Sequence, residues 1–409
     1  MTTSPQPISF DNTEYAFAYK SNAALRKAKF LFSSMGHPWL VKMGTKITPW
    51  AMNVGLPVNG LIRNTLFGQF VGGETLDQTA RVADILEKFD VQVILDYGVE
   101  GKEGEKSFDH ACEEFIRVIQ FAATQPNIPF MSIKVTGFAR FGLLEKLDKA
   151  AAPGHGVEGK IVIEVLDDEE KREWERVCTR MEKIIEVAAV NNVGVLVDAE
   201  ETWIQDPVDA LTMLMMEKYN QTKVVVYNTV QLYRHDRLQF LKDSHYQSKQ
   251  KNFLLGAKLV RGAYMEKERK RALEINYPSP IQPDKTSSDK DYNLAVKYTI
   301  EHLDDIAVIV ASHNEASNLL ATQLLQQNSR PFNHPHIHFS QLYGMSDNIT
   351  FNLAKAGCSV SKYLPFGPIK DVIPYLMRRA QENSSVSGHT GRELGLIKKE
   401  MERRKKSGA

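Results

Sequence analysis

Short apolar, β-branched segments alternate with longer segments of helical periodicity along most of the chain. The short segments have the length of buried strands, and the segments between them repeat apolar residues at helical spacing. This alternation is typical of a parallel sheet, and eight strand–helix units predict a (β/α)8 barrel, an α/β fold; a doubly wound open sheet is the alternative. The eight predicted strands are VQVILDYG (91–98), MSIKVTG (131–137), VGVLVDAE (193–200), KVVVYNTV (223–230), LLGAKLV (254–260), AVIVASHN (307–314), HIHFSQL (336–342) and CSVSKYL (358–364).

The regions outside this alternation predict two extensions of the barrel. Residues 1–70 predict a helical N-terminal arm, residues 71–385 the barrel, and residues 386–409 a basic helical tail. Within the barrel, residues 276–291 (NYPSPIQPDKTSSDKD) are rich in Pro, Ser and Asp. This composition predicts a long loop of the kind that often serves as a lid.

Composition and charge exclude several classes of protein. The 409 residues contain 51 basic and 50 acidic side chains, so no overall field predicts a nucleic-acid partner. The apolar runs are far shorter than the roughly 20 residues that span a bilayer. The N-terminus is partly acidic and lacks an apolar region after a basic start, so we expect no targeting peptide. Three widely spaced cysteines predict reduced thiols and a cytoplasmic location.

Polar side chains follow seven of the eight predicted strands at their carboxyl ends. In a (β/α)8 barrel this edge carries the active site, so these side chains predict one shared pocket. Lysine and arginine outnumber carboxylates here and on the last barrel helix, which favours an anionic ligand. The strand-end residues are Lys134, Asp198, Glu200, Glu201, Asn228, Gln231, Lys258, Arg261, His313, Asn314, Gln341 and Tyr363.

The segment KYLPFGPIKDVIPYLMRRAQEN (362–383) predicts a strand end, a Pro/Gly turn and a helix. We expect Asp371 to be the N-cap of this helix, which places Pro374 in the first turn. The face opposite the apolar one carries Tyr375, Arg378, Arg379 and Glu382. From the helix alone, a solvated face with an intrahelical ion pair is the alternative to a pair of anion-binding guanidinium groups.

The segment GAKLVRGAYMEKER (256–269) is unusual because a lysine lies within an apolar run. Strand alternation places Lys258 and Val260 on one face. Gly262 follows at the strand end, where a missing Cβ lets a flat ligand approach the backbone. The alternative is a buried strand in which the Lys258 side chain extends to solvent.

Two further motifs are weak. GHGVEG (154–159) matches G-x-G-x-x-G but does not follow a strand and open a helix, so we do not expect a Rossmann site. HPHIH places His334, His336 and His338 on one face of a strand. Because no H-E-x-x-H or H-x-x-E-H companion exists, we expect packing or surface roles for these histidines and predict no metal.

Five segments together resemble the proline dehydrogenase family. They are VDAEE, KLVRGAYMEKER, IVASHNE, QLYGM and KYLPFGPIKDVIPYLMRRAQEN, and the resemblance runs from Lys134 to Asn383. It implies a distorted (β/α)8 barrel that binds FAD non-covalently without a Rossmann motif. It also implies oxidation of L-proline to 1-pyrroline-5-carboxylate, the first step of proline catabolism to glutamate. Hydride would pass from proline C5 to flavin N5, and a membrane quinone would accept the electrons.

The resemblance also implies roles for individual residues. The substrate carboxylate would be bound by Lys134, Arg378 and Arg379; the ring would be packed by Tyr363, Tyr375 and Leu342, with Tyr264 closing the pocket. FAD would contact Ala199, Gln231, Val260, Arg261, Gly262, Ala263, His313 and Asn314. Asp198 and Lys258 correspond to the catalytic positions. Several bacterial members have Arg where this chain has Lys258, which keeps the charge but not the bidentate hydrogen bonding.

Other functions are compatible with the same residues. A 4-hydroxyproline dehydrogenase is the nearest alternative, but Tyr363 packed on the ring disfavours a 4-hydroxyl group. A Schiff-base lyase or aldolase-like barrel would use Lys134 or Lys258 as nucleophile. A third alternative is a barrel that binds an anion without catalysis.

The tail LIKKEMERRKK joins basic residues to Leu396, Ile397 and Met401. This pattern is typical of a solvated terminal helix; peripheral contact with an anionic membrane is the alternative. The oligomeric state is not predicted.

Overall fold

The computed structural model describes residues 8–37, 39, 42–43, 59–98, 103–385 and 387–408. Parts of the predicted arm, residues 1–7, 38, 40–41 and 44–58, therefore lie outside the described residues. By internal packing the chain divides into two compact units, one formed by residues 1–93 with 340–409 and the other by residues 94–339. The predicted domain boundaries after residues 70 and 385 stay a prediction.

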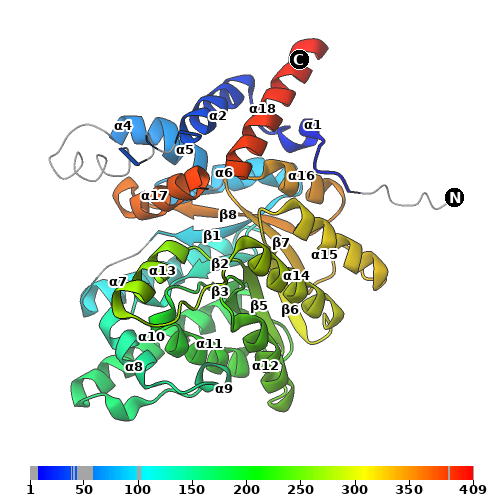
Figure 1. Ribbon diagram of the computed structural model, residues 1–409. Coiled ribbons are helices and arrows are strands. Elements are labelled where there is room, and N and C mark those ends of the chain that lie inside the picture. The colour runs from blue at the N-terminus through cyan, green and yellow to red at the C-terminus, as the bar shows by residue number, and fades with distance from the viewer. Residues whose placement is uncertain are drawn as a thin grey trace. The chain divides into compact units, whose positions relative to one another are not determined.

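The eight predicted strands are all present, and they form a closed barrel in the order β1 to β8 (Figure 1). This confirms the (β/α)8 fold, and the open doubly wound sheet is excluded. Strands buried on both faces read as continuous apolar runs, which is why the sequence reveals them. Their bounds are β1 Gln92–Tyr97, β2 Phe130–Ile133, β3 Gly194–Val197, β4 Val226–Gln231, β5 Leu255–Val260, β6 Ile306–Ala311, β7 Ile337–Leu342 and β8 Val360–Phe366.

Strand register places the candidate site residues at one edge. In the parallel ladder of residues 94–339, Ile133 lies opposite Val197. Thr229 lies opposite Lys258 in the pair of β4 and β5. Lys134 and Asp198 directly follow Ile133 and Val197, so both leave the sheet at its carboxyl edge, whereas the sequence assigned them to strands.

Residues 94–339 also contain the helices that cover strands β2 to β6 (Figure 1). Helix α10 (Asp168–Asn191) begins with a capping box. The Asp167 side chain accepts hydrogen bonds from the amides of Glu169 and Glu170, and the Glu170 side chain accepts one from the Asp167 amide. The helices are α7 Glu105–Ala122, α8 Phe141–Ala150, α9 His155–Glu158, α10 Asp168–Asn191, α11 Gln205–Tyr219, α12 Arg237–Gln250, α13 Met265–Ile275, α14 Lys285–Glu301 and α15 Glu315–Gln327. Short 3-10 turns are η2 Val135–Gly137, η3 Ile163–Val165 and η4 Thr202–Ile204.

The other unit joins both ends of the chain around an apolar core. Phe32, Phe70, Leu376 and Leu396 are buried together in this core, which therefore draws on the arm, the last barrel helix and the tail. Its helices are α1 Thr13–Ala16, α2 Asn22–Met35, α4 Asn59–Ile62, the π-helix η1 Arg63–Phe67, α5 Gly68–Phe70, α6 Leu76–Glu87, α16 Asp347–Lys355, α17 Ile369–Ser385 and α18 Ser387–Ser407.

Two local predictions were wrong. Helix α17 begins at Ile369 because the carbonyl of Pro368 accepts from the amides of Asp371 and Val372, at 2.9 and 3.3 Å. Asp371 therefore lies in the first turn instead of capping it, and Pro374 lies inside the helix.

The loop predicted over 276–291 ends earlier than expected. Helix α14 begins at Lys285, because the Asp284 carboxylate accepts from the Ser287 amide at 2.7 Å and caps the helix. Only residues 276–284 lie between helices α13 and α14.

The apolar side chains of the tail face neither solvent nor a membrane, so both interpretations of the tail are wrong for these residues. Leu396 and Ile397 are only 3% and 1% exposed, and Met401 packs against the same apolar core. These side chains stabilise the unit and are covered by protein. Among the described residues, no helix is both long enough and apolar enough to cross a membrane.

Candidate active site

Four charged side chains meet at the carboxyl ends of β1, β2, β3 and β5. The ammonium group of Lys134 lies 3.4 Å from Asp198 Oδ2 and 3.6 Å from Asp96 Oδ1. Lys258 pairs with the other oxygen of Asp198, and the Ser132 hydroxyl donates to that same oxygen at 2.6 Å. Asp96 and Lys258 are only 4% and 5% exposed. The structure therefore brings Lys134, Asp198 and Lys258 together, as the sequence predicted.

Electrostatics keep Asp198 ionised. Burial alone would raise the pKa of Asp198, but the ammonium groups of Lys258 and Lys134 and the hydrogen bonds that it accepts hold this pKa well below its usual range. A carboxylate with such a low pKa is a poor proton acceptor near neutral pH. Asp198 is therefore suited to fixing the two ammonium groups.

Asp96 and Ser132 were not singled out from the sequence. Each lies inside a run of apolar residues that reads as a strand, and the two face each other across β1 and β2. The sequence did contain a signal for Asp96, because a single carboxylate interrupts the apolar run VQVILDYG. A buried charge inside a strand requires a partner, and Lys134 supplies it.

The environment of the two lysines disfavours the Schiff-base alternative. A lysine nucleophile is activated by an apolar pocket or by a neighbouring cation. Here Lys134 and Lys258 each lie against a carboxylate instead.

The loop after β5 is fixed by Arg261, whose guanidinium group reaches three other elements. It pairs with Asp289 at 2.7 Å and donates to the hydroxyl groups of Ser312 and Ser317 at 2.9 and 3.0 Å. Gly262 follows with φ +139°, and a Cβ there would lie 2.4 Å from the Tyr233 ring. Only glycine fits this position.

The remaining predicted cofactor residues lie at the ends of neighbouring strands. Gln231 is buried at the end of β4 and donates to the Glu200 carbonyl at 3.0 Å, next to Ala199. Its amide oxygen has no hydrogen-bond partner among the described residues. His313 and Asn314 lie between β6 and α15, where the Asn314 side chain caps the helix. Val260 ends β5, and Ala263 and Tyr264 precede α13.

The predicted ring and carboxylate residues on β7, β8 and α17 lie in the other unit. Tyr363 is a strand residue of β8, and its carbonyl accepts from the Tyr343 amide, next to Leu342, at 2.9 Å. On α17, Tyr375 and Arg379 are each only 8% exposed. The Arg379 guanidinium lies 5.2 Å from the centre of the Tyr375 ring.

This burial rules out the fully solvated face that was the alternative for α17. Tyr375 belongs to the apolar core of its unit, and Arg378 is partly exposed. The side chain of Glu382, predicted to pair on this face, lies outside the described residues.

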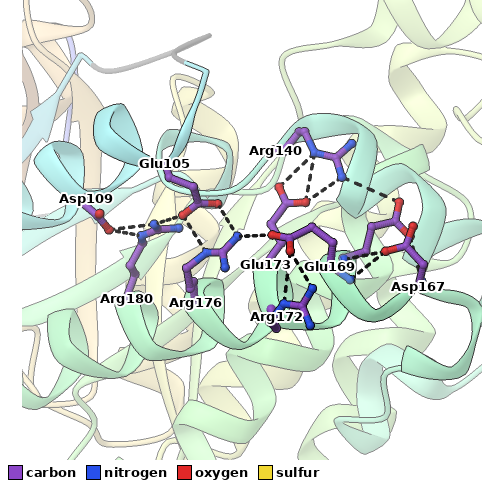
Figure 2. A network of polar contacts seen from close by, with 10 residues as sticks. Glu105, Asp109, Arg140, Asp167, Glu169, Arg172, Glu173, Arg176 and Arg180 are labelled. Carbon is purple, nitrogen blue, oxygen red and sulfur yellow. Dashed lines mark hydrogen bonds and ion pairs between the residues drawn. The ribbon is translucent and has the colours of Figure 1, made fainter.

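A network of ion pairs supports the backbone just after Lys134. In Figure 2, Arg180 reaches Asp109 and Glu105, which joins α10 to α7. Arg180 is itself 4% exposed and donates to the carbonyl of Phe138 at 3.3 Å. Through this bond the network holds the segment that begins at Lys134.

The three histidines of HPHIH do not share one face of a strand, because β7 begins at Ile337. His334 and His336 precede it with their ring centres 5.7 Å apart, whereas His338 lies within β7. Burial lowers the pKa of His338 to about 3, so its imidazole is neutral. The His336 ring bonds to the Leu303 carbonyl at 2.6 Å. Among the described residues, no group of three or more His, Cys, Asp or Glu side chains is arranged to hold a metal.

Comparison with solved structures shows where this fold occurs. The crystal structure of proline utilization A (PutA) from Bdellovibrio bacteriovorus, inactivated by N-propargylglycine, matches with a TM-score of 0.68 and 18% identity, over 92% of this chain and 36% of that chain. This chain therefore spans about a third of that protein. At this identity the likeness establishes the fold alone.

Comparison with curated sequences shows the family. Proline dehydrogenase 1, mitochondrial, from Dictyostelium discoideum is 34% identical over 86% of this chain and 67% of that protein. Carbapenem antibiotics biosynthesis protein CarD from Pectobacterium carotovorum subsp. carotovorum is 35% identical, over 82% and 83%. Hydroxyproline dehydrogenase from Xenopus laevis is 29% identical, over 95% and 88%. The family model described as proline dehydrogenase matches residues 79–392, and the chain belongs to the proline dehydrogenase family.

Proposed function

We propose that this chain oxidises L-proline to 1-pyrroline-5-carboxylate, the first step of proline catabolism to glutamate. Family membership makes it an oxidoreductase acting on proline. The observation that carries the proposal is the partly buried cluster of Lys134, Asp198 and Lys258, which offers fixed cationic groups at the barrel edge that carries active sites.

We propose FAD as the non-covalent cofactor, because the residues near β4 and β5 fit it. The partnerless amide oxygen of Gln231 is an acceptor for an N–H group of a bound molecule. Gly262 and Ala263 are exposed and present backbone with little side chain, and Arg261 is a cation held in place beside them. When bound, FAD supplies the acceptor for the hydride that leaves proline C5.

We further propose that Lys134, Arg378 and Arg379 bind the substrate carboxylate. Arginine donates two parallel hydrogen bonds to a carboxylate, which fixes its orientation. Burial of Arg379 supports this role, because charge–charge attraction is stronger away from water. Tyr363, Tyr375 and Leu342 would pack the pyrrolidine ring, and Tyr264 would close the pocket. Such positioning lowers the barrier of a hydride transfer, because the reacting atoms are already held at a productive distance and angle.

Asp198 and Lys258 are the proposed catalytic residues. The ionised carboxylate of Asp198 orients both ammonium groups, and the positive charge of Lys258 favours electron-rich groups beside it. Proline must lose its amine proton before hydride departs. Because the pKa of Asp198 is held so low, we propose that Asp198 does not take this proton. Its carboxylate instead orients the group that does.

The electron acceptor that we propose is a membrane quinone, as the resemblance of the sequence implies. Peripheral membrane contact is not supported by the apolar side chains of the tail, because they are buried. The cytoplasmic location stays a prediction.

Anaerobic mixing of the flavin-loaded protein with L-proline tests the proposal. We expect the flavin absorption near ~450 nm to bleach in the wild type. Arg378→Ala and Arg379→Ala should each require at least about tenfold more proline, the loss expected for one charged hydrogen bond. Lys370→Ala, an exposed cation on the same helix, is the matched control and should behave as wild type. An active enzyme without flavin, or unchanged proline affinity in both variants, would contradict the proposal.

Oxidation of 4-hydroxyproline is the second candidate, since a relative with that name is 29% identical. An aromatic ring packed on the pyrrolidine leaves a 4-hydroxyl group unpaired, at a cost of about 1–3 kcal/mol. We therefore expect kcat/KM for L-proline to exceed that for trans-4-hydroxy-L-proline by at least about tenfold. Equal values would refute the role of Tyr363.

A further inference from the structure

The turn that leads from β7 to α16, residues 343–346, is named here the β7–α16 turn. It begins directly after Leu342, and the amide of Tyr343 donates to the carbonyl of Tyr363 at 2.9 Å. Two residues proposed to pack the substrate ring are thus tied to one short segment. A displacement of this turn would shift Leu342 at its start and break the bond to Tyr363.

Buried charges hold the far end of the turn. Lys362 is fully buried and donates to the Met345 carbonyl at 2.6 Å, while it pairs with Asp347 at 2.9 Å. The other oxygen of Asp347 accepts from the Tyr19 hydroxyl at 2.9 Å and lies 3.5 Å from the ammonium group of Lys20. The N-terminal arm therefore supplies a positive charge and a hydrogen bond to Asp347, the residue that directly follows the turn.

The tail supplies the remaining contact. The carboxylate of Glu393, on α18, accepts a hydrogen bond from the backbone amide of Ser346. Ser346 has φ +50°, a left-handed conformation that is strained for a residue other than glycine and persists only where its surroundings hold it. Glu393 is 7% exposed, so this bond is shielded from water.

Helix α18 also fixes the arm segment that reaches Asp347. Arg404 donates to the carbonyls of Phe17 and Lys20 at 2.9 and 2.8 Å. Glu400 pairs with Arg404 at 2.7 Å and holds its guanidinium in place. The tail therefore acts on the β7–α16 turn twice, through Glu393 directly and through the docked segment that carries Tyr19 and Lys20.

We infer that Glu393 is a positioning residue for the substrate-ring pocket, acting through the amide of Ser346; this inference rests on the proposed function. Four groups of three other elements face the Glu393 carboxyl. Lys20 and Tyr19 come from the arm, Lys362 from β8 and Asp347 from α16. The tail thereby takes part in proline binding without touching the substrate.

Titration of Glu393 adds a pH dependence to this role. Burial, followed by the charge of Asp347, raises the pKa of Glu393 to about 7. The hydrogen bond from the Ser346 amide and the ammonium groups of Lys362 and Lys20 lower this pKa and offset part of the rise. A carboxylate accepts a hydrogen bond more strongly than a neutral carboxyl group. The hold on the β7–α16 turn therefore weakens as pH falls below about 7.

Steady-state kinetics of Glu393→Ala and Glu393→Gln test the inference. We expect KM for L-proline to rise at least about tenfold in Glu393→Ala with kcat within about twofold, because uniform binding is lost. Glu393→Asp should recover part of the affinity. In Glu393→Gln, the wild-type change of KM between pH 6 and 8 should disappear. Glu402→Gln, an exposed carboxylate on the same helix, is the matched control.

A second measurement separates this inference from the proposed function. Amide hydrogen exchange at the first turn of α16, without substrate, should be faster in Glu393→Ala than in wild type and unchanged in Glu402→Gln. If proline is not oxidised, the proposed function fails while the exchange difference persists. Wild-type exchange together with wild-type KM in Glu393→Gln and Glu393→Ala would overturn the inference.

Discussion

Lys134 and Asp198 form a partly buried ion pair, in which the Lys134 ammonium lies 3.4 Å from the Asp198 carboxylate. Because Lys258 occupies the other carboxylate oxygen, one aspartate holds two cations. Removing its charge would leave two ammonium groups close together and poorly hydrated. Such a site loses both its geometry and its electrostatic balance.

Asp198→Asn is therefore expected to slow flavin reduction by L-proline by about 10²-fold or more, the loss typical of a preorganised electrostatic group. Stopped-flow absorbance after anaerobic mixing measures this rate. Ser132→Ala removes only one neutral hydrogen bond from the same carboxylate and should cost less than about tenfold. A rate for Asp198→Asn close to that for Ser132→Ala would contradict an electrostatic role.

Arg180→Ala should lower the free energy of unfolding by about 1–3 kcal/mol. The buried guanidinium donates to the Phe138 carbonyl, and the substitution removes this hydrogen bond. Thermal melting measures the loss. Arg172→Ala is the control, since Arg172 pairs with Glu169 at an exposed site and should change stability by less than about 1 kcal/mol. KM for L-proline should rise only in the Arg180 variant, because its contact adjoins the segment after Lys134. Equal melting temperatures in the two variants would argue against this role.

The fold was predictable because its strands are buried on both faces. All eight apolar runs are strands, and their periodicity required no tertiary information. Composition misled the prediction at 276–291, where Ser and Asp residues form the polar first turns of α14. The Asp284 N-cap was a readable signal, but prolines at 278, 280 and 283 favoured a loop.

The candidate site was predictable where polar residues directly follow a strand, as Lys134 and Asp198 do, and where a lysine interrupts an apolar run, as Lys258 does inside β5. Asp96 was missed because it lies inside β1, one residue before the end of the strand, and reads as part of that strand. The burial of Leu396 depends on which helices cover the tail, and no pattern within α18 reveals that packing. Local periodicity finds elements, whereas their partners depend on contacts far apart in the chain.

Gly262→Ala is expected to weaken FAD retention and to lower the melting temperature. The added Cβ would lie 2.4 Å from the Tyr233 ring, and φ of +139° is strained for any residue with a side chain. Gel filtration followed by the flavin-to-protein absorbance ratio measures retention. Gly395→Ala is the matched control because no atom lies within 4 Å of its Cβ and the site is helical, so this variant should retain FAD and melt no lower than wild type. Retention of FAD by Gly262→Ala at the wild-type level would show that this backbone does not approach the cofactor.

Asp148 should make stability fall as pH rises. Burial raises its pKa from 3.8 to about 7, although the Asp206 amide donates to it at 3.0 Å. Between these two values the folded chain holds a proton that the unfolded chain has lost, so this group contributes stability at pH 4–5 that disappears as pH rises through about 7.

Melting temperatures at pH 5 and pH 8 should therefore show a smaller loss on raising pH in Asp148→Asn than in wild type. Asparagine keeps an oxygen that accepts from the Asp206 amide, so the comparison isolates the titration. Asp243→Asn, an exposed carboxylate on α12, should leave the pH dependence as in wild type. Burial lowers the pKa of His245, so this histidine makes stability rise with pH below its ordinary pKa of 6.5. This contribution is the same in all three proteins and does not affect the comparison. Identical pH dependence in wild type and Asp148→Asn would show that this carboxyl group titrates near its ordinary pKa.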